Sequence, residues 1–192
     1  MITPSLRDRI RPGVRVLFVG INPGIRSAEI GHHFAGYSNR FWKLLYESGL
    51  VPEAIGTEDD QRLPEWGYGI TNLVARATPG IGDLDRAEYE AGRRRLLAKI
   101  RRFRPQVAAL VGVTLYRALF RAGGAGEAGP AGGAVRGRLG RVLGLRPETL
   151  AGAEVFVLPN PSGRNANFSY SEMLEAFRAL RRHIDTEPRR GA

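Results

Sequence analysis

Four short runs of mainly apolar residues recur along the chain, and each predicts a buried β-strand. They cover residues 14–19, 70–74, 107–111 and 155–158. The runs are rich in β-branched and aliphatic residues, which favour the extended conformation. Most of their positions are apolar rather than alternately polar, a pattern typical of strands buried on both faces of a parallel sheet.

Between the predicted strands, apolar residues recur every three or four positions, which predicts helices. The predicted helices cover 41–48, 86–103 and 114–122, and a last one begins at residue 169. In the second, arginines fill the face opposite the apolar residues, and Pro105 ends the helix. We expect Thr114 to cap the third helix, and Ser169 to form a capping box with Glu172 at the start of the last.

Strands that alternate with helices in this way indicate an α/β fold. We expect a three-layer αβα sandwich with a short, mainly parallel central sheet, formed by a single domain over residues 1–192. Nine glycines fall within residues 123–144, so this stretch is expected to be a flexible excursion within the domain. Residues 188–192 are expected to form a frayed tail.

Composition excludes several classes of protein. Hydrophobic residues make up 43% and charged residues 25%, as in ordinary folded domains, and no apolar run approaches the ~20 residues that span a bilayer. The N-terminal segment lacks an apolar signal core, so we expect a cytoplasmic protein. The chain has no cysteine, which excludes disulfides, thiolate nucleophiles, zinc fingers and cysteine-ligated iron–sulfur clusters.

The net charge of +10, from 29 basic and 19 acidic residues, suggests a polyanionic partner such as nucleic acid. The alternative is arginine-rich coding in a GC-rich genome, since Lys43 and Lys99 are the only lysines and the other basic residues are all arginine. Charge alone does not decide between these readings.

Ligands of α/β folds bind beyond the carboxyl ends of the parallel strands, where residues 20–36 and 159–168 form loops. The first loop opens with Gly20-Ile-Asn-Pro-Gly24, a tight turn that holds Asn22 at the edge of the sheet. It lacks the Gly-Lys-Ser/Thr signature of a P-loop and the glycine spacing of a dinucleotide site. Taken alone, such a pattern is more often simply a turn.

Four sequence blocks together carry a more specific signal. After the first turn come His33-Phe-Ala-Gly36 with Asn39-Arg-Phe-Trp42, then Gly69-Ile-Thr-Asn-Leu73, and then Leu158-Pro-Asn-Pro-Ser-Gly163. In this order the blocks resemble the mismatch-specific uracil and thymine DNA glycosylases of the uracil-DNA glycosylase superfamily. The resemblance covers residues 14–182.

The resemblance implies a uracil-DNA glycosylase-like fold and an enzyme of base excision repair. Such an enzyme flips uracil, or a related damaged or mismatched pyrimidine, out of duplex DNA. As a monofunctional DNA N-glycosylase, it hydrolyses the N-glycosidic bond and leaves an abasic site. The resemblance implies no metal and no cofactor. Double-stranded DNA is the expected partner, no membrane is involved, and we expect a monomer.

The resemblance also implies roles for single residues. Asn22 is similar to the family's asparagine that holds the attacking water. Phe34 resembles the aromatic residue on which the flipped base stacks, with a core aromatic as the alternative. Gly24 stands where stricter uracil enzymes have a bulky tyrosine, which implies tolerance of larger pyrimidines. The residues implied for the base-binding pocket are Gly20, Ile21, Gly24, Ser27, Phe34, Asn39 and Asn72.

Residues 160–166 resemble the family's insertion loop, which enters the duplex and fills the space of the flipped base. The residues implied for DNA binding are Asn160, Pro161, Ser162, Gly163, Arg164 and Ala166. Arg164 stands where an apolar leucine is usual, and an arginine can instead hydrogen-bond the unpaired base or a phosphate. Asn160 replaces the histidine of the fast uracil enzymes, so no cationic donor to the departing base is expected at that position.

Because no cationic donor is expected at position 160, a carboxylate that activates the water is considered as well. Asp83 is the candidate, in the loop after the Gly69 block, whereas Asp85 is better explained as a helix cap completed by Glu88. His32 and His33 lie near the first motif, and we interpret both as structural or solvated.

Two alternatives from other classes remain at this point. One is a non-catalytic α/β domain that binds damaged or single-stranded DNA through the same pocket. The other is a flavodoxin-like enzyme acting on a small nucleotide or phosphate, which would show no preference for duplex DNA.

Overall fold

The computed structural model describes residues 6–120 and 142–186, and a five-stranded sheet forms their centre. The strand order is β2-β1-β3-β5-β4. The four parallel strands are β1 (Val16–Gly20), β2 (Tyr68–Asn72), β3 (Val107–Val111) and β5 (Ala153–Leu158). At one edge, β4 (Gly144–Leu150) pairs antiparallel with β5.

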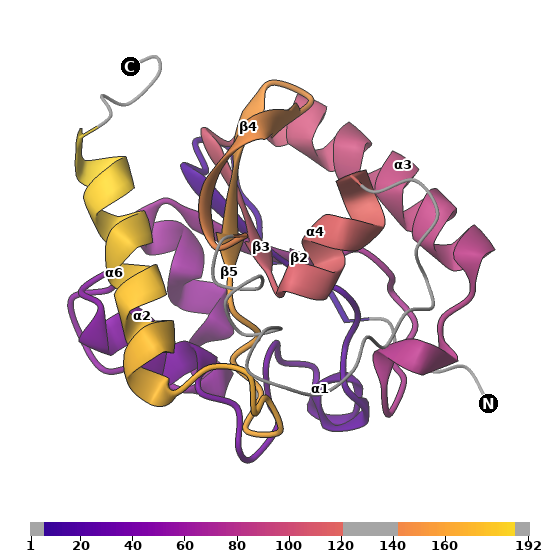
Figure 1. Ribbon diagram of the computed structural model, residues 1–192, viewed down its shortest axis with the longest axis horizontal. Coiled ribbons are helices and arrows are strands. Elements are labelled where there is room, and N and C mark those ends of the chain that lie inside the picture. Colours follow the sequence, from indigo (N-terminus) through magenta and orange to yellow (C-terminus); the bar gives the residue numbers. More distant parts are fainter. Residues whose placement is uncertain (1–5, 121–141, 187–192) are drawn as a thin grey trace.

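Helices cover both faces of the sheet, and Figure 1 shows α2 and α6 on one side with α3 and α4 on the other. The α-helices of the described residues are α1 (Ile25–Ile30), α2 (Phe41–Glu47), α3 (Arg86–Phe103), α4 (Val113–Phe120) and α6 (Tyr170–Thr186). Two 3₁₀ helices are η1 (Thr57–Trp66) and η2 (Ile81–Asp83). The predicted α/β class with a mainly parallel central sheet is confirmed.

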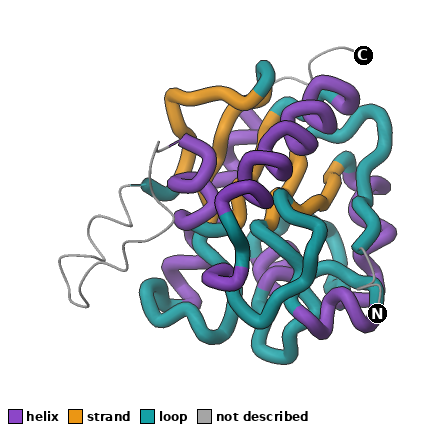
Figure 2. Tube along the Cα trace, turned by 90° about the vertical axis from the view of Figure 1, so that its right-hand side faces the viewer, coloured by secondary structure: helices purple, strands orange, loops and turns teal. Residues whose placement is uncertain are grey.

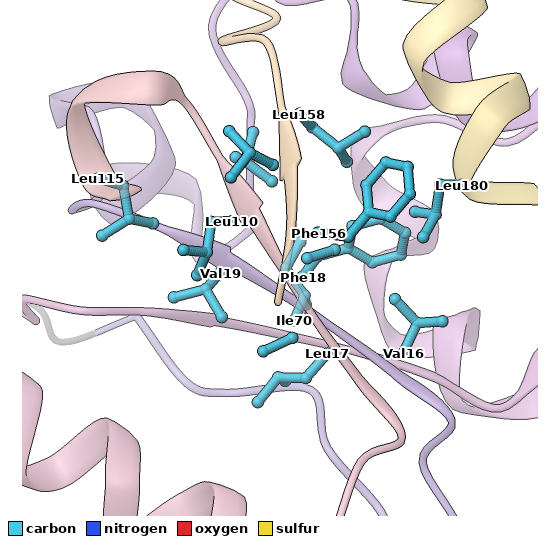
Figure 3. Packing of buried hydrophobic residues seen from close by; sticks show 14 of the residues in the cluster. Val16, Leu17, Phe18, Val19, Ile70, Leu110, Leu115, Phe156, Leu158 and Leu180 are labelled. Carbon is cyan, nitrogen blue, oxygen red and sulfur yellow. The ribbon is translucent and has the colours of Figure 1, made fainter. Parts of the chain in front are cut away.

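The core fills the spaces between the sheet and its two helical layers. On one face, the rings of Phe18 and Phe41 meet edge-on with centroids 5.3 Å apart, and Phe41 meets Phe177 of α6 at 6.1 Å. On the other face, Leu115 of α4 lies on the side of Leu110, as Figure 3 shows. All five side chains are fully buried, so each contributes the free energy of removing its apolar surface from water.

The starts of the helices test the predicted caps. Both capping boxes are confirmed, since Glu88 N donates to Asp85 Oδ1 at 2.8 Å and Glu172 N donates to Ser169 Oγ at 3.3 Å. The predicted cap at Thr114 is wrong, because α4 already begins at Val113. At the start of this helix, the carbonyl of Gly112 accepts from Leu115 N at 3.1 Å and from Tyr116 N at 3.4 Å.

The sheet contains one strand that the apolar runs do not predict. In β4 exposed and partly buried residues alternate, because an edge strand is covered on one face only. β2 also lies two residues earlier than the predicted strand at 70–74, since its first residue, Tyr68, pairs with Val16. Of the predicted excursion at 123–144, all but the last three residues lie outside the described residues, as does the tail at 188–192.

Within the described residues, no helix is long and apolar enough to cross a membrane. Loops gather in the lower half of the molecule as Figure 2 shows it. Because β1 and β5 both run parallel to β3, the two loops singled out in the sequence leave the sheet at the same end.

Candidate functional site

A cavity of about 590 Å³ lies beyond the carboxyl ends of β1 and β2. This volume is within the range of small-molecule and cofactor sites, about 300–1,000 Å³. A larger and more open groove of about 1210 Å³ lies at the opposite ends of the same strands, next to Gly13 and Gly67, and none of the predicted site residues lines it.

The smaller cavity brings together most of the predicted site. It is lined by Asn22 and by every residue predicted for the base pocket: Gly20, Ile21, Gly24, Ser27, Phe34, Asn39 and Asn72. From the insertion loop, Asn160, Ser162 and Arg164 line it, whereas Pro161, Gly163 and Ala166 do not. Asp83 is not among the lining residues either.

Hydrogen bonds fix the orientation of the Asn22 amide. Its Nδ2 donates to Thr78 Oγ1 at 2.7 Å and to the carbonyl oxygens of Arg76 and Pro23, each at 3.2 Å. The Thr78 hydroxyl donates its proton to the carbonyl of Gly80 at 2.5 Å, so toward Asn22 it can act only as an acceptor. With three acceptors on the nitrogen side, Oδ1 is left to accept a hydrogen bond from a water or a ligand.

One hydrogen-bond partner of Asn22, Arg76, is held by Glu88 at the start of α3. Arg76 donates from Nε and Nη2 to the two carboxylate oxygens of Glu88, at 2.7 and 2.8 Å. That bidentate pair, together with the Asp85 N–H, lowers the pKa of Glu88 to about 2, so the carboxylate stays charged at neutral pH. The carbonyl of Arg76 is thereby positioned to accept from Asn22.

Gly20 lets two cavity side chains approach the end of β1 closely. A Cβ atom at this position would lie 2.6 Å from Asn72 Oδ1 and 3.6 Å from Phe34 Cζ. The first distance is shorter than any normal contact, so any side chain at position 20 would displace Asn72. The glycine therefore opens the cavity at the point where Asn72 and Phe34 converge.

Phe34 is held in a strained conformation at the cavity wall. Its φ is +51°, in the left-handed region that costs a non-glycine residue of order 1–3 kcal/mol. Hydrogen bonds hold the residues on both sides: Trp42 Nε1 donates to His33 O at 3.2 Å, and Ala35 N donates to Ser27 Oγ at 3.0 Å. One face of the Phe34 ring stacks on Phe41 with centroids 4.2 Å apart. It is thus both a core aromatic and a cavity residue.

His33 is a buried, neutral part of the cavity wall. Its Nε2 donates to the Arg7 carbonyl at 3.0 Å, which leaves Nδ1 as the acceptor facing Asn72 Nδ2 at 3.4 Å. Burial lowers the pKa of the imidazole, so His33 brings no charge to the cavity at neutral pH. His32 pairs with the buried Asp60 at 3.0 Å, and the interpretation of both histidines as structural is in agreement with these contacts.

The charged side chains on the described cavity wall are all positive. Among the described residues that line it, Arg26 and Arg164 are positive and none is acidic. The other polar groups are amides and hydroxyls, including Asn22, Asn72 and Thr78. Such a wall favours an anionic ligand, or a neutral one that becomes negative during a reaction.

The insertion loop is organised by its own short-range hydrogen bonds. Asn160 Oδ1 accepts from Ser162 N at 3.0 Å, and Ser162 Oγ accepts from Arg164 N at 3.3 Å. Asn165 Nδ2 donates back to the Asn160 carbonyl at 2.8 Å. The loop therefore holds the exposed Arg164 in place at the rim of the cavity, with the loop backbone already ordered.

The insertion loop also packs closely on residues 36–40. Arg40 N donates to the Pro161 carbonyl at 3.0 Å. A Cβ atom on Gly163 would lie 2.4 Å from Ser38 Cβ and 2.8 Å from the Ser38 carbonyl oxygen. Only a glycine permits this approach, so Gly163 acts in packing rather than as part of the cavity wall.

Asp83 has a local role in its own turn. Its Oδ2 accepts from Gly80 N at 3.1 Å, and its carbonyl accepts from Arg76 Nη2 at 2.6 Å. The carboxylate thus caps the short η2 turn outside the cavity. Its catalytic role stays a prediction.

Sequence reasoning missed Thr78 and Tyr37. Thr78 is the closest hydrogen-bond partner of Asn22 although 56 positions separate them, and the Thr78-Pro-Gly block after β2 is the signal that singles it out. Tyr37 lines the cavity with a side chain that is 90% exposed, and nothing in the sequence indicates that exposure.

Comparison with known proteins identifies the family. The family model described as the Uracil DNA glycosylase superfamily matches residues 8–181 of the chain. The chain belongs to the uracil DNA glycosylase superfamily. Its fold is similar to the solution structure of a candidate uracil DNA glycosylase from Methanosarcina acetivorans, with a TM-score of 0.59 and 18% sequence identity. The similarity covers 96% of this chain and 99% of that one.

The family match covers nearly all the residues that line the cavity and the larger groove alike. The predicted site residues separate the two, because Asn22 and the predicted base pocket line the cavity and none of the predicted residues lines the groove. We therefore take the cavity as the candidate active site.

Proposed function

We propose that this protein is a monofunctional DNA glycosylase of base excision repair, which hydrolyses the N-glycosidic bond of uracil or a related damaged or mismatched pyrimidine in duplex DNA. The observation that carries the proposal is the Asn22 amide. Three acceptors hold its nitrogen, and its oxygen is left for a water in a cavity that also contains Phe34.

In the proposed reaction, the extruded base stacks on the free face of Phe34, and Asn22 Oδ1 accepts a hydrogen bond from the water. The water oxygen forms a bond to C1′ of the deoxyribose as the bond from C1′ to the base nitrogen breaks. The bonding electrons leave with the base, and the water gives up one proton to solvent. An amide is not a general base, so the catalytic effect comes from positioning of the water, and modest turnover is expected.

The positive charge of the cavity wall favours departure of the base with the bonding electrons. The departing pyrimidine takes up negative charge, and no carboxylate of the described lining opposes it. Arg26 and Arg164 at the rim also attract DNA phosphates.

Gly24 supports a substrate range wider than uracil. It lines the cavity, and a Cβ atom added there would meet no other atom within 4 Å. The space that a bulky residue would take is therefore open to substituents on the pyrimidine ring. We propose on this ground that thymine or other enlarged pyrimidines in mispairs are also substrates, as in the mismatch-specific branch of the superfamily.

The positions of the lysines support a monofunctional enzyme. A glycosylase that also cuts the DNA backbone commonly attacks C1′ with an amine. The two lysines of the chain are engaged elsewhere, Lys43 with Glu47 at 3.5 Å and Lys99 with Asp8 at 2.6 Å, and neither lines the cavity. The expected product is therefore an intact strand with an abasic site.

The test is incubation with an end-labelled duplex that contains one uracil, followed by hot alkali. Strand cleavage at the uracil is expected only after the alkali, and duplexes with thymine or larger lesions opposite guanine measure the substrate range. Binding without alkali-sensitive sites would favour the non-catalytic DNA-binding domain instead.

The Asp83→Asn variant tests whether Asp83 activates the attacking water or whether Asn22 positions it without a carboxylate. The amide keeps an oxygen for Gly80 N–H and removes only the charge, so we expect a single-turnover rate within about threefold of wild type, since the carboxylate lies outside the cavity. A loss of about 100-fold would instead make Asp83 a catalytic carboxylate.

A further inference from the structure

We propose that Tyr37 is an aromatic DNA contact that stacks on a nucleotide beside the one entering the cavity. The proposal rests on the proposed function, because it names a contact of the same site. Among the described residues, Tyr37 is the most exposed large hydrophobic side chain, at 90%. A tyrosine exposed to this degree buries little apolar surface within the fold, so most of its surface is accessible to a partner.

The ring is held in place by Arg26 although it is exposed. The guanidinium carbon of Arg26 lies 3.9 Å from the ring centroid, and its Nη1 donates to the Tyr37 hydroxyl at 2.7 Å. Arg26 is itself fixed, since its Nε donates to the Ala35 carbonyl at 2.9 Å. A ring that is already oriented loses little conformational entropy when it binds, which favours a role in recognition.

Only one face of the ring is available to a partner. Arg26 lies over the other, and no other aromatic ring of the described chain stacks on Tyr37. A flat, open aromatic face suits the flat face of a nucleotide base, and stacking of this kind tolerates any base. The cation behind the ring adds positive charge at the point where a phosphate backbone would pass.

Tyr37 lies at the same opening as the insertion loop. It lines the cavity together with Arg164, and the next residue, Ser38, is the one on which Gly163 packs. DNA that receives Arg164 and delivers a nucleotide into the cavity therefore passes Tyr37. Since the cavity itself takes the flipped base, the ring is left to contact a neighbouring nucleotide.

The test compares Tyr37→Ala, Tyr37→Phe and the control Tyr46→Ala. Tyr46 is also exposed, at 45%, but lies in α2 beside the groove at the opposite ends of the strands. Each variant is titrated with a duplex that carries a tetrahydrofuran abasic-site analogue, and its single-turnover release of uracil is measured at saturating enzyme. Binding is repeated over a range of salt concentrations.

We expect Tyr37→Ala to bind the duplex about tenfold more weakly, while Tyr37→Phe stays within about threefold of wild type because it keeps the stacking face. The salt slope of Tyr37→Ala should stay unchanged, since no charge is removed. Tyr46→Ala should behave as wild type.

Equal affinities of Tyr37→Ala and Tyr46→Ala would overturn the proposal. An equal loss of affinity in Tyr37→Phe and Tyr37→Ala would also overturn it, because that result assigns the effect to the hydroxyl. A wild-type protein that does not bind the duplex would overturn it as well. If wild type binds but releases no uracil, the proposed function fails, while the binding series still decides the role of Tyr37.

Discussion

Replacing Asn22 with alanine should lower the single-turnover rate of uracil excision by about 10²- to 10³-fold, the range seen when one preorganised polar group is removed from an active site. The variant loses the Asn22 side-chain oxygen, which we propose positions the attacking water. Duplex affinity should change little, because Phe34, Arg164 and the insertion loop remain in place. The measurement is excision with enzyme in excess, together with a separate titration of the abasic-site duplex.

Thr78→Val provides the matched variant for the Asn22 prediction. It keeps the side-chain shape and removes the hydroxyl, which accepts from Asn22 Nδ2 at 2.7 Å and donates to the Gly80 carbonyl at 2.5 Å. An intermediate loss of rate is expected, because the carbonyls of Arg76 and Pro23 still orient the amide. An Asn22→Ala enzyme that retained more than about a tenth of the wild-type rate would contradict the role given to Asn22.

Gly163→Ala is expected to give the second-largest effect, through the position of the insertion loop. The added methyl group would lie 2.4 Å from Ser38 Cβ, so the loop has to move away from residues 36–40. Displacements of about 1 Å can reduce rates by about 100-fold. Because the loop is proposed to fill the space of the flipped base, excision from duplex DNA should fall much more than excision from a single strand.

Ser38→Gly in the Gly163→Ala background serves as the control. It removes two of the three clashing atoms and leaves the Ser38 carbonyl oxygen at 2.8 Å, so part of the duplex activity should return. Ser38→Gly alone should be close to wild type. Equal losses on duplex and single-stranded DNA would point to general damage of the fold and against an inserted loop.

The sequence predicts the site best where parallel strands determine it. Asn22 and the insertion loop are far apart in the chain, yet both follow buried strands, and the carboxyl ends of parallel strands meet at one edge. The apolar run at 14–19 and the two capping boxes likewise follow from local patterns. Phe34 lies beyond α1 in the connection from β1 to α2, and hydrogen bonds hold its neighbours at the cavity wall.

The features that the sequence did not predict depend on contacts between residues far apart in the chain, or on how much of a strand or side chain the fold covers. The bond from Asn22 to Thr78 joins residues 56 positions apart, and no periodicity encodes it. β4 alternates because an edge strand is half covered, which an apolar run cannot reveal. The hydrogen bond that Asp83 Oδ2 accepts from Gly80 N is likewise visible only in the structure, and the predicted catalytic role of Asp83 stays a prediction.

The most direct test of the account is the release of free base. Wild-type protein in excess over a uracil-containing duplex should release free uracil in a one-to-one ratio with alkali-sensitive abasic sites, and Asn22→Ala should release almost none over the same time. A wild-type protein that binds the duplex and releases no uracil, thymine or larger pyrimidine would contradict the account.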